Sequence, residues 1–141
     1  MYKKLSDSLL SVVFTTLLLI SGSSAHAQAE RSTDSRWNGQ WLAEGTLFQI
    51  SVTVSNGVMT VGEVESLGFV WDSEAGEVDG NLATIPVSYA GVSGIVQAEL
   101  VDATTAVAVA ASCMPEFMVV CTLARNQQAV FRKVSEPGGE P

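Results

Sequence analysis

Apolar and polar residues alternate along much of the chain after residue 36. In the clearest case Phe48, Ile50, Val52 and Val54 share one face of an extended segment, with polar side chains between them. Successive side chains of a strand point to opposite faces of a sheet, so this period of two predicts a strand with one buried and one hydrated face. Further short strands are predicted at residues 58–65, 67–71, 82–89, 95–101, 105–111, 117–125 and 129–134. Residues 77–80 are expected to add either a short strand or an extended turn.

Turn residues separate these segments. Ser55, Asn56 and Gly57 predict a tight hairpin, because Asn-Gly tolerates the positive φ angles that such turns require. Residues 72–76 form a second turn cluster. About eight to ten short strands joined in sequence predict an all-β fold, an up-and-down antiparallel β-barrel or meander over residues 37–134. Closure into a barrel would remove the exposed sheet edges.

In two segments the sequence also allows something other than a regular strand. Pro86 lies inside a predicted strand and has no backbone N–H, which indicates an edge, a bulge or a wide gap at that point. Residues 102–112 are rich in alanine, and Asp102 could cap a helix there. The alternation of Val107 and Val109 favours a strand instead.

The first 27 residues have the three parts of a secretory signal peptide. Lys3 and Lys4 supply positive charge, residues 9–20 form an apolar run, and Ala25-His26-Ala27 matches the A-x-A cleavage pattern. The apolar run is shorter than the roughly 20 residues of a spanning helix. We expect cleavage near Ala27, with Ala29 as the alternative, and a periplasmic or secreted product with no membrane span in its mature form.

Removal of residues 1–27 changes the composition of the chain. Two of the seven basic and one of the fifteen acidic side chains leave, so the mature net charge is −9. This charge repels phosphate backbones and argues against a nucleic-acid partner. The single histidine, His26, leaves as well. Without an imidazole the mature chain has no Ser-His-Asp or Cys-His arrangement and no histidine-ligated zinc site.

Two cysteines remain, Cys113 and Cys121. An even count in an exported small domain predicts a disulfide, since a redox-active pair usually has C-x-x-C spacing. The loop between them carries the apolar side chains of Met114, Phe117 and Met118. Binding through a loop that is already ordered loses less entropy, so these residues are candidate binding residues. The alternative is a hairpin pinned for stability alone.

Acidic residues are densest between residues 63 and 79. Its members are Glu63, Glu65, Asp72, Glu74, Glu77 and Asp79. A calcium loop is one interpretation, but Gly76 and Ala83 do not match the glycine and glutamate positions of an EF-hand that begins at Asp72. Nothing indicates a glycosidase pair of carboxylates flanking a cleft. We therefore expect a solvated rim, with no metal, no cofactor and no catalytic residues.

The aromatic residues are thinly spread and most are expected in the core. Phe69 and Trp71 lie in one short predicted strand, and one of them is expected at the surface. A tryptophan exposed at the mouth of a barrel would be an anchor for a partner, which makes Trp71 another candidate binding residue. Packing in the core or rim is the alternative.

The two ends of the predicted domain carry a family pattern. Gly39-Gln40-Trp41 opens the first strand and Arg132 lies in the last. A G-x-W followed by a late arginine resembles the calycin pattern of lipocalin-like and avidin-like barrels. The resemblance implies that Arg132 packs across Trp41 and closes one end of the barrel, as a guanidinium stacks well on an indole. The same opening is similar to that of small periplasmic barrels that inhibit metalloproteases.

These features predict a non-catalytic binding module. Ala106, Ala108, Ala110 and Ala111 are small residues on one predicted strand, and they could leave room for a small apolar ligand inside the barrel. The alternative is an inhibitor or interaction protein that acts through its loops on a protein partner. An enzyme is not expected. Residues 28–36 are predicted to be a flexible lead-in, and residues 135–141 a disordered tail.

Overall fold

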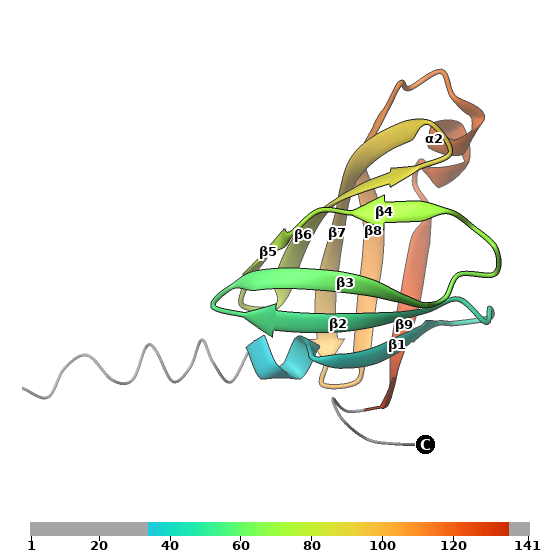
Figure 1. The fold of residues 1–141 in the computed structure, drawn as a ribbon. Helices are drawn as coiled ribbons and strands as arrows, with labels where there is room; N and C mark the ends of the chain where they lie inside the picture. The colour runs from blue at the N-terminus through green and yellow to red at the C-terminus, as the bar shows by residue number, and fades with distance from the viewer. Residues whose placement is uncertain (1–33, 136–141) are drawn as a thin grey trace, which may run out of the picture.

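The computed structural model describes residues 34–135. Nine strands and a helix follow one another: β1 (Gly39–Ala43), β2 (Gln49–Ser55), β3 (Val58–Glu65), β4 (Trp71–Ser73), β5 (Gly76–Asp79), β6 (Leu82–Tyr89), β7 (Val92–Asp102), β8 (Thr105–Met114), α2 (Val119–Ala124) and β9 (Gln128–Ser135). Figure 1 shows the strands wrapped around a common interior, with α2 at one end. The predicted signal peptide, most of the lead-in and most of the tail lie outside the described residues.

The sheet closes on itself through antiparallel pairs. β1 pairs with β2 and also with β9, so the first and last strands are neighbours. The pairing of β6 with β7 completes the ring. β4 and β5 both pair with β6, at Trp71 to Ser73 and at Glu77 to Asp79, and together they fill one position of the barrel. The prediction of an up-and-down antiparallel barrel is confirmed, as eight strands and one extra strand.

Pro86 lies opposite the break between β4 and β5. The Glu74 N–H donates to the Pro86 carbonyl at 3.1 Å, which places the proline's missing N–H on the same side as that break. The partner strand β7 runs past Pro86 without interruption, with Pro86 opposite Ile95. The proline therefore removes no ladder hydrogen bond from the long β6–β7 pair, as expected from a gap or bulge at this position.

One glycine allows a tight turn, and another allows two strands to approach each other closely. Asn56 and Gly57 have φ angles of 52° and 74°, the positive values of the tight hairpin predicted between β2 and β3. Gly39 has a φ of 137°, and a Cβ on it would collide with the Ser135 carbonyl oxygen of β9. The glycine of the G-x-W opening thus lets the last strand pass close to the first.

Three local predictions are wrong. Residues 67–71 were expected as a strand and 72–76 as a turn, but β4 is Trp71–Ser73, and Leu67 and Gly68 have positive φ angles of 56° and 79° in the turn before it.

Residues 117–125 were expected as a strand, but α2 occupies residues 119–124. Cys121 must return to within 5.4 Å of Cys113 between their Cα atoms, and a helical turn shortens the chain where an extended strand would carry it away. Residues 34–37, which overlap the predicted flexible lead-in, form a helical turn that places Trp37 in the core.

The core runs along the barrel axis and is built from inward positions of the alternating strands. Trp41 and Met59 are its largest fully buried side chains. Around them pack Trp37, Val52, Val54, Ala83, Ile85, Leu100 and Ala106. The alternation of residues 48–54 is borne out at Val52 and Val54, which are both buried, while Thr53 between them is exposed.

The predicted disulfide between Cys113 and Cys121 is confirmed. We expect the C113S/C121S double variant to lose about 2–3 kcal/mol of unfolding free energy, because the bond closes a short loop in the unfolded chain. Denaturant unfolding of the variant and the oxidised wild type measures this loss. An unchanged midpoint would show that α2 is held by other contacts.

Candidate functional site: an apolar cavity inside the barrel

Residues 34–38 seal one end of the barrel. The Trp37 Nε1–H donates to the Gly80 carbonyl at 3.3 Å, and the Trp41 Nε1–H donates to the Trp37 carbonyl at 2.8 Å. Asp34 accepts a hydrogen bond from the Gly57 N–H at 3.1 Å, and Arg36 donates to the Asn81 side chain. In Figure 1 the helical turn lies beside the end of β2. The segment is therefore hydrogen-bonded to two hairpin turns, one at Gly57 and the other at Gly80 and Asn81, and it covers the indole rings.

The cation above Trp41 is Lys133, and not Arg132 as the family pattern implied. The Lys133 ammonium lies 5.1 Å from the centre of the indole ring, and its Nζ donates to the Arg36 carbonyl at 2.6 Å. The register explains the change, because β9 places Lys133 opposite Trp41 and Arg132 opposite Leu42. Lys133 thus connects the last strand, the first strand and the sealing segment.

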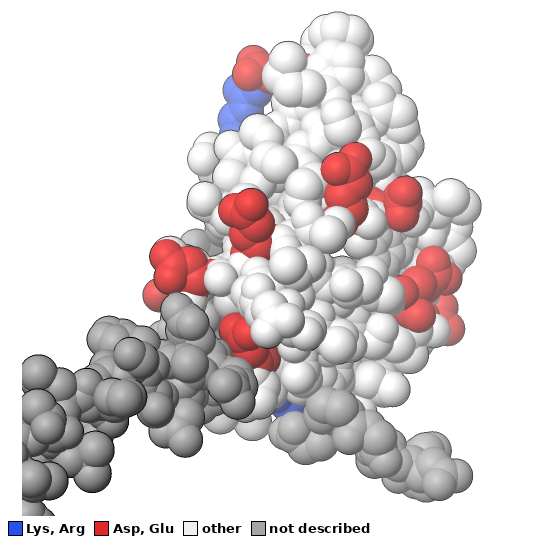
Figure 2. Space-filling model, turned by 60° about the vertical axis from the view of Figure 1, so that its left-hand side comes forward, with Lys and Arg blue, Asp and Glu red and all other residues white. Residues whose placement is uncertain are grey.

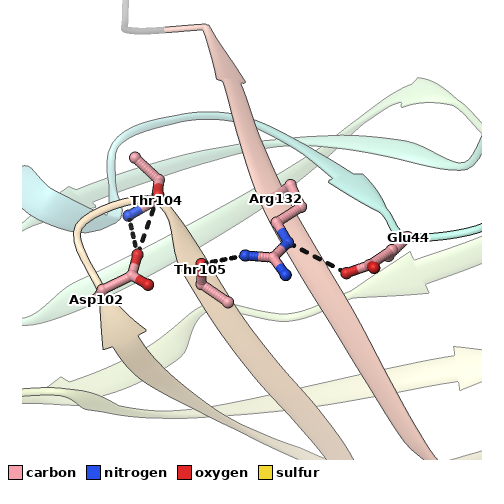
Figure 3. Close-up of polar contacts among 5 residues, drawn as sticks. All are labelled: Glu44, Asp102, Thr104, Thr105 and Arg132. Carbon is pink, nitrogen blue, oxygen red and sulfur yellow. Dashed lines mark hydrogen bonds and ion pairs between the residues drawn. The ribbon is translucent and has the colours of Figure 1, made fainter.

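Arg132 points to the outside of the barrel (Figure 3). Its Nε donates to Glu44 at 3.1 Å and a terminal nitrogen donates to the Thr105 hydroxyl at 2.7 Å. Both members of the Arg132–Glu44 ion pair are more than half exposed. Exposed pairs of this kind contribute roughly 0–1 kcal/mol. Arg132 therefore stabilises the outer surface of β8 and β9 weakly and does not close the barrel end.

Asp102 forms the turn between β7 and β8. Its carboxylate accepts hydrogen bonds from the Thr104 N–H at 2.7 Å and from the Thr104 hydroxyl at 3.0 Å (Figure 3). These bonds favour the charged form. The Thr104 N–H, followed by the Thr105 hydroxyl, lowers the pKa of Asp102 below its ordinary value.

A cavity of about 220 Å³ occupies the barrel interior between the sealed end and the loops at the other end. Every residue of its wall is apolar or aromatic. The rings belong to Trp37, Trp41, Phe48, Trp71 and Phe131. No lining side chain carries an oxygen or a charge, so the cavity offers a purely apolar surface.

Small side chains at paired positions of two adjacent strands leave this space unfilled. Ala98 on β7 lies opposite Ala108 on β8, and both line the cavity together with Ala106. Leucine or isoleucine at these positions would fill the volume. Of the four alanines singled out in the sequence, Ala106 and Ala108 line the cavity, whereas Ala110 and Ala111 are exposed.

The candidate binding residues are divided between two places. Trp71 lies in the cavity wall next to Phe48, with ring centroids 5.9 Å apart. Phe69 is 49% exposed and packs edge-on against Tyr89. Trp71 is thus half-buried, with part of its ring in the cavity wall. Phe48, Phe131 and Ala98 were not singled out beforehand, although the alternation from Phe48 to Val54 already placed Phe48 on the inward face.

The other candidates lie on the disulfide-linked segment, away from the cavity. Phe117 is 83% exposed, Met114 is also exposed, and Met118 is half-buried. None of the three is part of the cavity wall. The structure therefore separates an interior apolar site, which includes Trp71, from an exterior apolar surface on and before α2.

Acidic groups lie in several small groups over the face seen in Figure 2, with uncharged surface between these groups. Among residues 34–135, no three side chains of the metal-ligating types come together in a way that could hold a metal ion. Within the same range no helix has the length and apolar character needed to cross a membrane.

Comparison of the chain with protein-family models, with curated proteins and with solved structures gave no match. The site is therefore interpreted from its own geometry.

Lys133 and Arg132 differ in their expected contribution to stability. We expect K133M to lower the free energy of unfolding by about 1–3 kcal/mol, because it removes the cation above Trp41 and a charged hydrogen bond to the sealing segment. The matched variant R132M should cost less, because it removes an exposed ion pair and the hydrogen bond to Thr105 but no contact with Trp41 or the sealing segment. Urea unfolding of both variants gives the comparison, and a larger loss for R132M would contradict the assignment.

The Asp102 turn predicts a pH dependence. Because folding lowers the pKa of Asp102, its contribution is present above the ordinary aspartate value of about 3.9. The contribution disappears as the pH falls through the lowered pKa of the folded state. We expect D102N to be less stable than the wild type at pH 6, with the gap closing below pH ~3.9. Thermal unfolding across this range measures the gap, and a gap independent of pH would contradict the assigned hydrogen bonds.

Proposed function

We propose that this protein is an exported, non-catalytic binding module that holds a small apolar molecule inside its barrel. The observation that carries the proposal is the cavity, whose wall is entirely apolar in a domain otherwise dominated by acidic surface groups. An apolar cavity of roughly 150 Å³ is already large enough to take up benzene. The cavity of about 220 Å³ therefore suits a ligand of about two fused rings.

The chemistry of the wall determines which molecules the site favours. Burial of apolar ligand surface contributes about 25 cal/mol per Å², and the closed sheet holds the lining side chains in place before binding. A charged ligand would lose its hydration with no opposite charge in the wall to offset that loss. The preferred ligand is therefore small, apolar and neutral.

The calycin-like pattern is in keeping with this proposal. Gly39 and Trp41 open the first strand, and a cation from the last strand lies over the indole at the sealed end, although this cation is Lys133. The disulfide is consistent with an oxidising compartment outside the cytosol. Barrels that are sealed at one end and hollow inside are suited to the retention of small ligands.

Two substitutions of the same kind test the proposal. A108L places a larger side chain in the cavity, whereas A110L adds the same atoms at an exposed position of the same strand. With naphthalene as the probe, we expect A108L to weaken binding at least tenfold, a change of about 1.4 kcal/mol, and A110L to match the wild type. Protein-detected NMR titration measures both affinities, and circular dichroism checks that each variant is folded.

Failure of naphthalene to bind the wild type, or equal binding by A108L and A110L in their folded states, would contradict the cavity as the site. A second candidate function is supported by the exposed apolar side chains of Phe117, Val119 and Leu123 on the disulfide-linked segment. This surface fits a barrel that binds a protein partner through its loops. In that case F117S would abolish partner binding and A108L would leave it unchanged.

A further inference from the structure

The α2 segment, residues 113–125, carries apolar side chains that the fold leaves uncovered. Phe117, Val119 and Leu123 are 83%, 70% and 69% exposed. Val119 and Leu123 lie about one turn apart on the same face of α2. The residue that α2 buries is Cys121. Within the part of the chain that the structure describes, the barrel therefore covers the half-cystine of the helix and leaves its apolar face open.

The disulfide fixes this face in position. A helix of six residues is not stable in isolation, and the bond between Cys113 and Cys121 attaches α2 to the end of β8. A surface that is already ordered loses little conformational entropy when it binds. Groups of exposed large apolar side chains commonly mark interaction surfaces. The α2 segment thus has the properties of a contact surface.

The charge of the α2 segment differs from that of the rest of the domain. Residues 34–135 contain eleven acidic and four basic side chains. The α2 segment contains one of each, Glu116 and Arg125, so the whole negative excess lies elsewhere. Two copies of an acidic domain repel each other over most of their surfaces. The neutral α2 segment is therefore a place where two copies can meet without that repulsion.

Glu116 and Arg125 stand at opposite ends of the exposed apolar residues. Glu116 directly precedes Phe117, and Arg125 directly follows α2. Among residues 34–135, neither of the two charged side chains forms an ion pair. A two-fold axis through the middle of the segment exchanges its ends, so each Glu116 would face the Arg125 of the other copy. The segment is therefore self-complementary, with apolar side chains in the middle and opposite charges at its ends.

A lipid surface or a basic protein fits the α2 segment less well. Insertion of Phe117 into a bilayer would carry the neighbouring Glu116 carboxylate towards hydrocarbon, where no cation is present to pair with it. A second copy supplies the Arg125 guanidinium instead. A basic protein would be attracted by the acidic remainder of the domain and not by a neutral segment. The charge pattern thus favours a second copy of this chain.

We propose that the protein forms a two-fold symmetric dimer in which the α2 segments of two copies pack antiparallel. The apolar faces of the two helices are in contact, and an ion pair between Glu116 and Arg125 lies at each edge. The inference goes beyond cavity binding and assigns a partner to the exposed surface of the second candidate function. The segment is smaller than the roughly 20–30 residues that each partner contributes to a standard interface, so we expect a reversible dimer with a micromolar dissociation constant.

The apolar contact is tested with two matched leucine variants. L123S removes an apolar side chain from the proposed interface, and L47S makes the same change at a leucine of similar exposure in the loop between β1 and β2. In Figure 1 that loop lies apart from α2. Sedimentation equilibrium from about 10 µM to 1 mM, on protein purified with its disulfide formed, should show a dimer that L123S weakens at least tenfold and L47S less than twofold.

Charge reversal tests the antiparallel arrangement. E116R gives the α2 segment two positive charges, and R125E gives it two negative charges. Each variant alone should weaken the dimer at least tenfold, because two attractive pairs become repulsive. A mixture of the two variants restores both pairs of opposite charges in a heterodimer, so it should associate about as tightly as the wild type. Circular dichroism checks that each variant is folded.

A wild type that remains monomeric at about 1 mM would overturn the proposal, and so would equal effects of L123S and L47S. If the mixed charge variants associate no more tightly than either alone, the antiparallel pairing is overturned. Binding of the monomer to phosphatidylcholine vesicles, with loss of binding in L123S, would assign the surface to lipid instead. Leu123 is not part of the cavity wall, so folded L123S should bind naphthalene as the wild type does, which keeps failure of the dimer separate from failure of the proposed function.

Discussion

The pairing of β1 with β9 is the constraint on which the rest of the structure depends. It joins the two ends of the described chain, removes the free edges of the sheet and places Lys133 opposite Trp41. Once the ring is closed by backbone hydrogen bonds, its circumference is fixed and the interior volume depends only on the inward side chains. Alanines at positions 98, 106 and 108 then leave a space that larger residues would have filled.

The sealed end depends on the same closure. Lys133 can reach both the Trp41 ring and the Arg36 carbonyl because β9 runs alongside β1 at this point. The helical turn at residues 34–37 in turn covers the indoles and hydrogen-bonds to the turn at Gly80. The two ends of the barrel therefore differ. The sealing segment, residues 34–38, covers one end, and longer loops surround the other.

Much of the fold could be predicted from local sequence. The alternation from Phe48 to Val54, the Asn56-Gly57 turn and the pair Cys113 and Cys121 each act through short-range physics, and each is present in the structure. The helix α2 was missed because its apolar residues look like a strand, whereas the disulfide forces that segment to turn back. A covalent bond between two residues eight positions apart overrode the strand propensity of the segment.

The site was less predictable than the fold. Which of Arg132 and Lys133 meets Trp41 depends on a register shift between β1 and β9 at Gln40 and Trp41, and residue type does not reveal such a shift. Alternation would place Phe69 and Trp71 on the same face of a strand; they differ in exposure because β4 begins at Trp71 and Phe69 lies in the loop before it.

The claim that a closed barrel retains an open apolar interior is tested most directly by a crystal of the protein under xenon pressure. Xenon enters empty apolar cavities and is located by its scattering. The account predicts xenon inside the barrel, among the rings of Trp37, Trp41 and Trp71. A barrel interior filled by side chains, with xenon absent or bound only on the outer surface, would contradict it.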